Sequence, residues 1–138
     1  MASPVHTFNE QAILNSEIRL FNEQNPESLF KRDFIAVEEI VSLIFEVLKN
    51  DNCYGVFDAG TANPISFNKI AYLIKNYWDE NGRTINIREI DFPDKLKGYY
   101  QSYTCADMNY IALKNLNWEA NQPEVNIRRF LSSYNKLK

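Results

Sequence analysis

The helix predicted from Ser66 to about Trp78 limits the possible folds of this chain more than any other feature. Apolar side chains recur there at spacings of three and four residues, which places them on one helical face: Phe67, Ile70, Leu73, Ile74 and Tyr77. Ser66 occupies the position of an N-cap. A helix with such a face belongs against the core of a packed domain.

Further helices are expected over residues 4–15, from Glu38 to about 49, over about 107–115 and from Pro123 onward. Ser3 is the predicted cap of the first helix. The second carries a broad apolar stripe of Ile40, Val41, Leu43, Ile44, Val47 and Leu48, and the last carries Ile127, Phe130, Leu131, Tyr134 and Leu137.

Short strands are expected at residues 18–21, at 33–37 and around residues 85–87, and a short strand followed by a turn is expected within residues 55–60. The strand at 33–37 is expected to be buried on both faces because its apolar residues are nearly continuous. The fold class that follows is α/β, with short strands separated by amphipathic helices.

Length and composition favour one globular domain spanning residues 1–138, with 45% hydrophobic and 24% charged residues. A net charge of −3 argues against a nucleic-acid surface. No apolar run approaches the roughly 20 residues that span a bilayer, and the first residues do not resemble a signal peptide, so we expect a cytoplasmic protein without membrane contact.

Metal chemistry is not expected, because His6 is the single histidine and Cys53 and Cys105 form no Cys-x-x-Cys pattern. We expect both cysteines to be free and mostly buried, since a disulfide would require the fold to bring two distant residues together.

The segment from Phe92 to Asp107 shows neither strand alternation nor a helical stripe. It combines two lysines, Lys95 and Lys97, with three tyrosines and Gly98. Ammonium and phenol groups suit a phosphorylated or sugar-bearing ligand. The residues alone leave open the alternative of a surface loop whose tyrosines cover a helix.

This segment reads F-P-D-K-L-K-G-Y-Y-Q-S-Y-T-C-A-D and closely resembles the late loop of the ADP-L-glycero-D-manno-heptose 6-epimerases. Phe30–Phe34 resembles the F-K-R-D-F of the same family, and Met1–Ser3 resembles its M-A-S. The order and approximate spacing of the three motifs agree with the carboxy-terminal part of such an enzyme. These epimerases are extended short-chain dehydrogenase/reductase enzymes, so the resemblance implies the substrate-binding part of a Rossmann-type protein.

The resemblance implies an isomerase of carbohydrate metabolism that supplies the activated heptose of lipopolysaccharide cores. In that reaction NADP⁺ takes a hydride from C6 of the heptose and returns it to the opposite face. The chemistry needs a Gly-rich dinucleotide loop and a Tyr-x-x-x-Lys pair. The four glycines, at positions 55, 60, 82 and 98, cannot form that loop.

No catalytic or cofactor-binding residue is therefore expected in this chain; NADP and the catalytic pair would belong to an amino-terminal Rossmann half. Tyr110 and Lys114 have the catalytic spacing, but they follow the late loop, which is the wrong position for the family. We interpret that pair as structural.

Substrate-binding roles transfer to residues that match the family motifs. Arg32 matches the arginine of K-R-D-F, and its fork can grip a diphosphate; the alternative is an ion pair with Asp33 or Glu38. Tyr100 matches the tyrosine of K-G-x-Y-Q, with core packing as its alternative. For Lys95 and Lys97, ligand binding and simple solvation remain equally open.

Two further family contacts transfer less directly. Phe21, Asn22, Glu23 and Gln24 replace the family's substrate-contacting F-E-G-S, without its glycine. The family's substrate histidine falls on Thr7, with His6 one residue away, and one residue turns a helical side chain by about 100°.

The sequence thus predicts the substrate domain of an ADP-glyceromanno-heptose 6-epimerase, present as a fragment or truncated product and inactive alone. Its expected partners are an ADP-heptose-like nucleotide-sugar and the missing Rossmann half, with a homo-oligomer left open. The alternative is a stand-alone, non-catalytic module that binds a nucleotide-sugar or another subunit.

Overall fold

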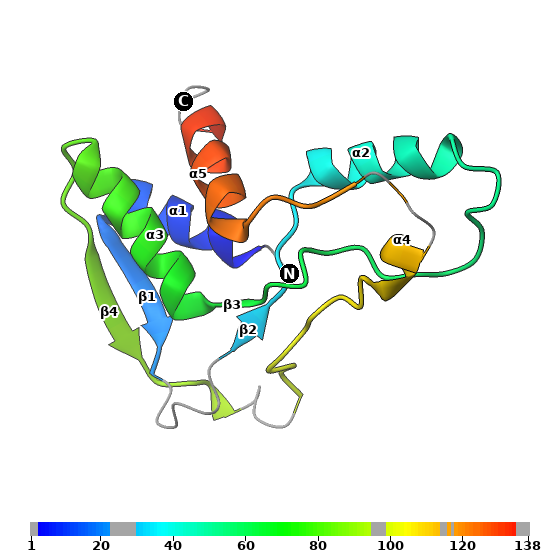
Figure 1. Ribbon diagram of the computed structural model, residues 1–138. Helices are drawn as coiled ribbons and strands as arrows, with labels where there is room; N and C mark the ends of the chain where they lie inside the picture. The colour runs from blue at the N-terminus through cyan, green and yellow to red at the C-terminus, as the bar shows by residue number, and fades with distance from the viewer. Residues whose placement is uncertain (1–2, 23–29, 95–98, 114–115, 117, 135–138) are drawn as a thin grey trace.

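The computed structural model describes residues 3–22, 30–94, 99–113, 116 and 118–134 (Figure 1). Its elements run in the order α1 (Pro4–Asn15), β1 (Glu17–Phe21), β2 (Lys31–Arg32), α2 (Val37–Leu48), β3 (Ile65–Ser66), α3 (Phe67–Glu80), β4 (Asn86–Ile90), α4 (Asn109–Leu113) and α5 (Pro123–Tyr134). Helices interspersed with short strands confirm the predicted α/β class.

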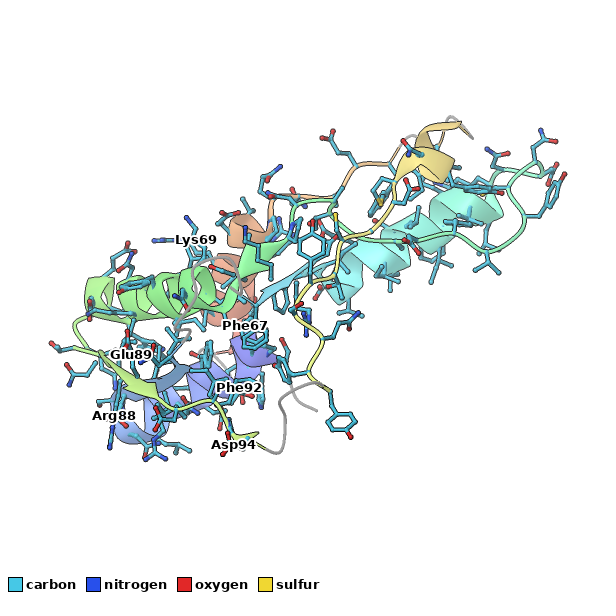
Figure 2. The ribbon with its side chains drawn as sticks, turned by 90° about the horizontal axis from the view of Figure 1, so that it is seen from below. Phe67, Lys69, Arg88, Glu89, Phe92 and Asp94 are labelled. Atoms are coloured by element: carbon cyan, nitrogen blue, oxygen red, sulfur yellow. The ribbon has the colours of Figure 1, made fainter. Side chains whose placement is uncertain are left out.

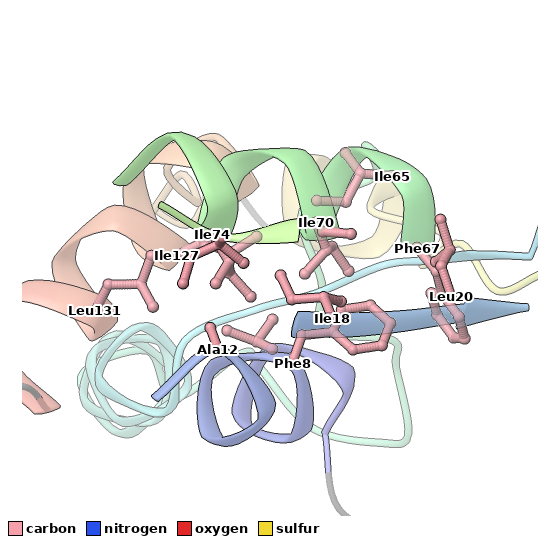
Figure 3. Close-up of a cluster of buried hydrophobic side chains, with 13 residues drawn as sticks. Phe8, Ala12, Ile18, Leu20, Ile65, Phe67, Ile70, Ile74, Ile127 and Leu131 are labelled. Carbon is pink, nitrogen blue, oxygen red and sulfur yellow. The ribbon is translucent and has the colours of Figure 1, made fainter. Parts of the chain in front are cut away.

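Five of these elements, α1, β1, α3, β4 and α5, pack into a compact body. Strands β1 and β4 are parallel, with Glu17 opposite Asn86 and Phe21 opposite Ile90. Apolar side chains fill the space between α3 and α1, with β1 running through it (Figure 3). The side chains of the cluster with no exposed surface are Ala12, Ile18, Ile70, Ala71, Ile74 and Ile85.

Helix α3 forms as the sequence predicts. The Ser66 side chain accepts a hydrogen bond from the Lys69 amide at 3.1 Å and caps the first turn. The apolar stripe faces inward, with Phe67, Ile70 and Ile74 buried. Helix α5 likewise buries Ile127 and Leu131, whereas Leu137 lies outside the described residues.

Helix α2 projects away from the body, together with α4 and the segment that joins α2 to β3, in both views (Figures 1 and 2). Only Glu39 and Leu43 are buried in α2. Ile40 and Val47 are half-buried. The exposed apolar side chains of the helix form what we call the α2 face: Val37, Val41, Ile44, Phe45 and Leu48. Of the predicted stripe, Leu43 is buried, but no described part of the chain covers Val41, Ile44 and Leu48.

The root of α2 is fixed to the body through the buried carboxylate of Glu39. Its Oε1 accepts hydrogen bonds from the Asn121 amide at 2.7 Å and the Asn121 side chain at 2.6 Å. Its Oε2 accepts one from Asn126 Nδ2 at 2.6 Å. The direction of α2 is therefore set by hydrogen bonds from α5 and from the segment that leads into it.

Two predicted strands are wrong. Residues 33–37 contain no strand, because β2 ends at Arg32 and the Asp33 amide bonds the Thr104 side chain, at 3.2 Å, instead of a strand neighbour. Residues 55–60 contain none either, and Val56 is fully exposed. A strand needs a paired neighbour, and in the described chain neither segment has one.

Smaller differences concern the caps and the thiols. Ser3 makes no side-chain capping bond to α1, although Pro4 begins the helix as expected. Both cysteines are free, but Cys105 is exposed and Cys53 only half-buried, so the expected burial is wrong. None of the described helices combines the length and apolarity that crossing a bilayer would take.

Candidate functional site

Two of the motifs that are distant in sequence meet at strand β2. β2 pairs antiparallel with β3, with Lys31 opposite Ser66 and Arg32 opposite Ile65. On its other side, the Lys31 amide donates to the Ser102 carbonyl at 2.9 Å, and the Thr104 amide donates to the Lys31 carbonyl at 3.2 Å. The K-R-D-F motif is thus held against the late loop.

Arg32 lies over two aromatic rings. Its guanidinium carbon is 5.5 Å from the centre of the Tyr100 ring and 5.9 Å from that of Phe67, a cation–π geometry. Neither Asp33 nor Glu38 forms a salt bridge with it, so the ion-pair alternative fails among these described residues. Among the described residues its one hydrogen bond, donated to the Lys31 carbonyl at 3.1 Å, uses only Nη1. Much of the guanidinium fork is therefore available to an anion.

Tyr100 belongs to an aromatic cluster at the end of the body. Its ring centre is 4.7 Å from that of Phe30, 5.6 Å from that of Phe92 and 6.5 Å from that of Phe67. Phe67 begins α3 and Phe92 follows β4, and both are labelled in Figure 2. Tyr100 remains half-buried, so packing and ligand contact are compatible.

A pocket of about 380 Å³ opens between α1, β1 and this cluster. Thr7, Phe21 and Tyr100 all line it, together with Gln11, Phe67 and Ile90. Three predicted substrate residues from separate parts of the sequence therefore share one pocket. Most of its surface is apolar, which suits the face of a sugar or base ring.

His6 points elsewhere. Its ring meets that of Tyr134 edge-on at 5.6 Å, and it lines a second cavity, of about 460 Å³, between α1, α5 and the start of α2. The rotation of about 100° per helical residue separates it from Thr7. Of the two candidates, only Thr7 lies in the pocket with Phe21 and Tyr100.

The remaining predicted residues are placed less fully. Asn22 is exposed, and its amide donates to the Ile90 carbonyl at 2.7 Å, which extends the β1–β4 pairing. Glu23, Gln24, Lys95 and Lys97 lie outside the described residues. The sequence pattern assigns Phe67 to the core and does not identify it as part of this site. Its position directly after the Ser66 cap indicates a helix start but does not indicate ligand binding.

Asp33 occupies the junction behind Arg32. One carboxylate oxygen accepts from the Thr61 amide at 2.8 Å and the Thr61 hydroxyl at 2.5 Å. The other accepts from the amides of Ala62 and Ala106, both at 3.0 Å. Burial alone would raise the pKa of Asp33, but these hydrogen bonds outweigh it and lower the pKa below its ordinary value of 3.8.

The residues present do not fit NADP. A dinucleotide site needs a Gly-rich turn that leads from a parallel strand into a helix. Among the described glycines, Gly82 lies in the turn from α3 to β4, and Gly55 and Gly60 lie in a segment without a strand. We therefore assign no cofactor-binding or redox role to any described residue of this chain.

Other chemistry-bearing groups have structural surroundings. The Tyr110 hydroxyl donates to the Tyr54 carbonyl, and its ring stacks on Phe57 at 4.7 Å, in line with a structural role; Lys114 is not described. Within the described ranges, no three His, Cys, Asp or Glu side chains lie together as a metal site would need.

Known proteins resemble this chain over nearly its whole length. No protein-family model matches the chain. Over 135 residues the chain is 32% identical to the ADP-L-glycero-D-manno-heptose-6-epimerase of Alkalilimnicola ehrlichii, covering 96% of this chain but 41% of that protein.

Two solved structures share the fold. The ADP-L-glycero-D-manno-heptose-6-epimerase of Helicobacter pylori superposes with a TM-score of 0.72 at 19% identity, over 97% of this chain and 38% of that one. The UDP-N-acetylglucosamine 4-epimerase of Methanobrevibacter ruminantium superposes with a TM-score of 0.75 at 17% identity, over 99% and 40%.

The fold is therefore that of a part of the extended short-chain dehydrogenase/reductase epimerases, as the sequence predicts. Within that class, the chain is similar to the ADP-L-glycero-D-manno-heptose 6-epimerases along nearly its whole length and corresponds to their carboxy-terminal part. It spans less than half the length of these relatives.

Proposed function

We propose that this chain is the substrate-binding part of a nucleotide-sugar epimerase that acts on ADP-glyceromanno-heptose. The observation that carries the proposal is the meeting of Thr7, Phe21 and Tyr100 in one pocket, with Arg32 over two rings that line it. A diphosphate flanked by two ring systems needs this combination of a cationic fork and aromatic walls.

Each group has a defined task in this proposal. The Arg32 guanidinium binds diphosphate oxygens in two directions, and its position over Phe67 and Tyr100 holds it in place. The hydroxyls of Thr7 and Tyr100 bond polar groups of the ligand. The Phe21 ring packs on a flat ligand face.

Turnover requires a second polypeptide part. The proposal assigns NADP and the catalytic Tyr/Lys pair to an amino-terminal nucleotide-binding half, so this chain is inactive alone. We place the complete enzyme in the cytoplasm; assembly into a homo-oligomer is compatible with the proposal but not required by it.

The α2 face is the proposed contact with that half. Val37 and Leu48 are 69% and 73% exposed, and Val56, in the next segment, is fully exposed. A contiguous apolar face of this kind marks an interaction surface. Its proposed occupant is the nucleotide-binding half, because more than half the length of the related epimerase has no counterpart in this chain.

The alternative is a non-catalytic module that binds a nucleotide-sugar or another subunit. Sedimentation of the isolated chain separates the two. An orphaned half exposes its α2 face and associates, whereas a stand-alone module that needs no second half stays monodisperse.

The test of the leading proposal is reconstitution. The chain is combined with the amino-terminal remainder of the Alkalilimnicola ehrlichii epimerase, and C6 epimerisation of the ADP-heptose is followed. We expect turnover by the complex and none by either part. A folded, NADP-loaded complex that is inert would overturn the proposal.

A further inference from the structure

The guanidinium and the two aromatic rings of the site come from three segments of the chain, with one side chain from each. β2 carries Arg32, the segment through β3 leads to Phe67, and the late loop carries Tyr100. These residues are far apart in sequence, so something must fix the three segments relative to one another.

The carboxylate of Asp33 connects all three. It belongs to the residue directly after Arg32, it binds Thr61 and Ala62 in the segment before Phe67, and it binds the Ala106 amide after Tyr100. Four donors from two segments thus converge on one side chain of the third.

The junction around Asp33 is closely packed, and no cation from the described residues pairs with the carboxylate. A methyl group added at Gly60 would lie 2.5 Å from an Asp33 carboxylate oxygen and 2.5 Å from the Ala106 methyl carbon. None of the salt bridges among the described residues involves Asp33. Neutral amides and one hydroxyl hold the charge instead, and hydrogen bonds of this kind are directional and strong.

We infer that Asp33 is a positioning residue that sets Arg32, Phe67 and Tyr100 in register for an anionic ligand. This inference rests on the proposed function, since it concerns the same site. Asp33 itself does not touch the ligand. Its carboxylate faces Thr61, Ala62 and Ala106, while the Arg32 guanidinium lies over the rings.

A double-mutant cycle with ADP as the probe tests the inference. In Asp33→Asn the side-chain oxygen still accepts hydrogen bonds, but the side-chain NH₂ group is a donor and faces backbone amides that are also donors. We therefore expect the ADP dissociation constant to rise about tenfold. Arg32→Ala should weaken binding at least as much. Because part of the Asp33 effect acts through Arg32, the two losses should not add, and the double variant should bind less than tenfold more weakly than Arg32→Ala alone.

A milder variant covers the case in which Asp33→Asn does not fold. Thr61→Val removes one hydroxyl donor and keeps its amide, and should raise the dissociation constant about threefold. Thr84→Val makes the same change at an exposed residue outside the junction and should leave binding unchanged. Equal effects of Thr61→Val and Thr84→Val would overturn the inference.

The Arg32 Nε–H resonance provides a readout that needs no ligand. Asp33→Asn or Thr61→Val should shift or broaden that signal, whereas Thr84→Val should not. If the wild-type chain does not bind ADP, the proposed function is wrong about the ligand. The Arg32 signal still tests whether Asp33 positions Arg32, because that measurement needs no ligand. An unchanged Arg32 signal in folded variants, with only the melting temperature lowered, would show that Asp33 merely stabilises the fold.

Discussion

Helices α2 and α3 carry comparable apolar stripes but have opposite surroundings. In α3 the stripe is buried, and Ile70 and Ile74 have no exposed surface. In α2 the stripe residues Ile44 and Leu48 are 51% and 73% exposed, and only Leu43 is buried. Helical periodicity therefore predicts an apolar face that must be buried, but it does not show whether the burying residues belong to the same chain.

The largest expected effect is on folding. Ile74→Ala removes buried carbons from the centre of the body and should lower the free energy of unfolding by about 2–5 kcal/mol. Ile44→Ala should change it by no more than about 0.5 kcal/mol, since that side chain is half-exposed. Urea unfolding followed by tryptophan fluorescence measures both. Equal losses would show that α2 is packed in the free chain and would remove the contrast.

The next effect concerns association through the α2 face. Ile44→Glu should reduce self-association of the isolated chain by about tenfold or more, because a charge on an apolar interface is costly. Tyr72→Glu, on the exposed side of α3, is the matched control, with its side chain 54% exposed.

Sedimentation of both variants across a concentration series provides the comparison. If the two substitutions changed association equally, the α2 face would have no special part in it.

Substitutions at two arginines distinguish effects on ligand binding from effects on the stability of the body. Arg32 and Arg83 both lie over aromatic rings, Arg83 at 5.6 Å from the Trp78 ring centre. Arg83 also bonds the Ile13 carbonyl and so joins α1 to the end of α3. Arg32→Ala should weaken ADP binding about tenfold with little loss of stability.

Arg83→Ala should do the reverse, lowering the melting temperature while leaving the ADP affinity unchanged. Calorimetric titration gives the ADP affinity of each variant, and thermal unfolding gives its melting temperature. A loss of ADP affinity in Arg83→Ala alone would move the site away from Arg32.

The smallest effect is a pH dependence at the junction of β2 with its neighbours. The folded protein lowers the pKa of Asp33 below 3.8. A carboxyl of this kind adds stability above its unfolded pKa, and that stability is lost as the pH falls through the folded pKa. The difference in unfolding free energy between wild type and Asp33→Asn should therefore be constant near neutral pH and shrink below about pH 4. Urea titrations from pH 7 to pH 3 measure it, and a difference as large at pH 3 as at pH 7 would contradict the assignment.

The sequence predicts the body well because its elements cover one another. The stripes of α3 and α5 and the pairing of β1 with β4 need no partner outside the described chain. The strands expected at 33–37 and 55–60 failed because apolar continuity cannot supply a neighbouring strand. β3 is too short, at two residues, to leave a pattern.

The candidate site was predictable to a similar extent. Motif resemblance identified Arg32, Tyr100 and Phe21, and counting along α1 identified Thr7; the structure brings the last three into one pocket. Asp33 was not identified, because its partners Thr61 and Ala106 lie 28 and 73 residues away. Only the folded chain shows that connection.

Hydrogen exchange of the α2 amides tests the central claim, that the cover of α2 lies outside this chain. The exchange is measured in the free chain and in the catalytically active complex with an epimerase amino-terminal half. We predict that protection rises across Val37–Leu48 and through residues 53–57 on complex formation, while α3 exchanges as before. An active complex in which α2 exchanges as fast as in the free chain would contradict the account.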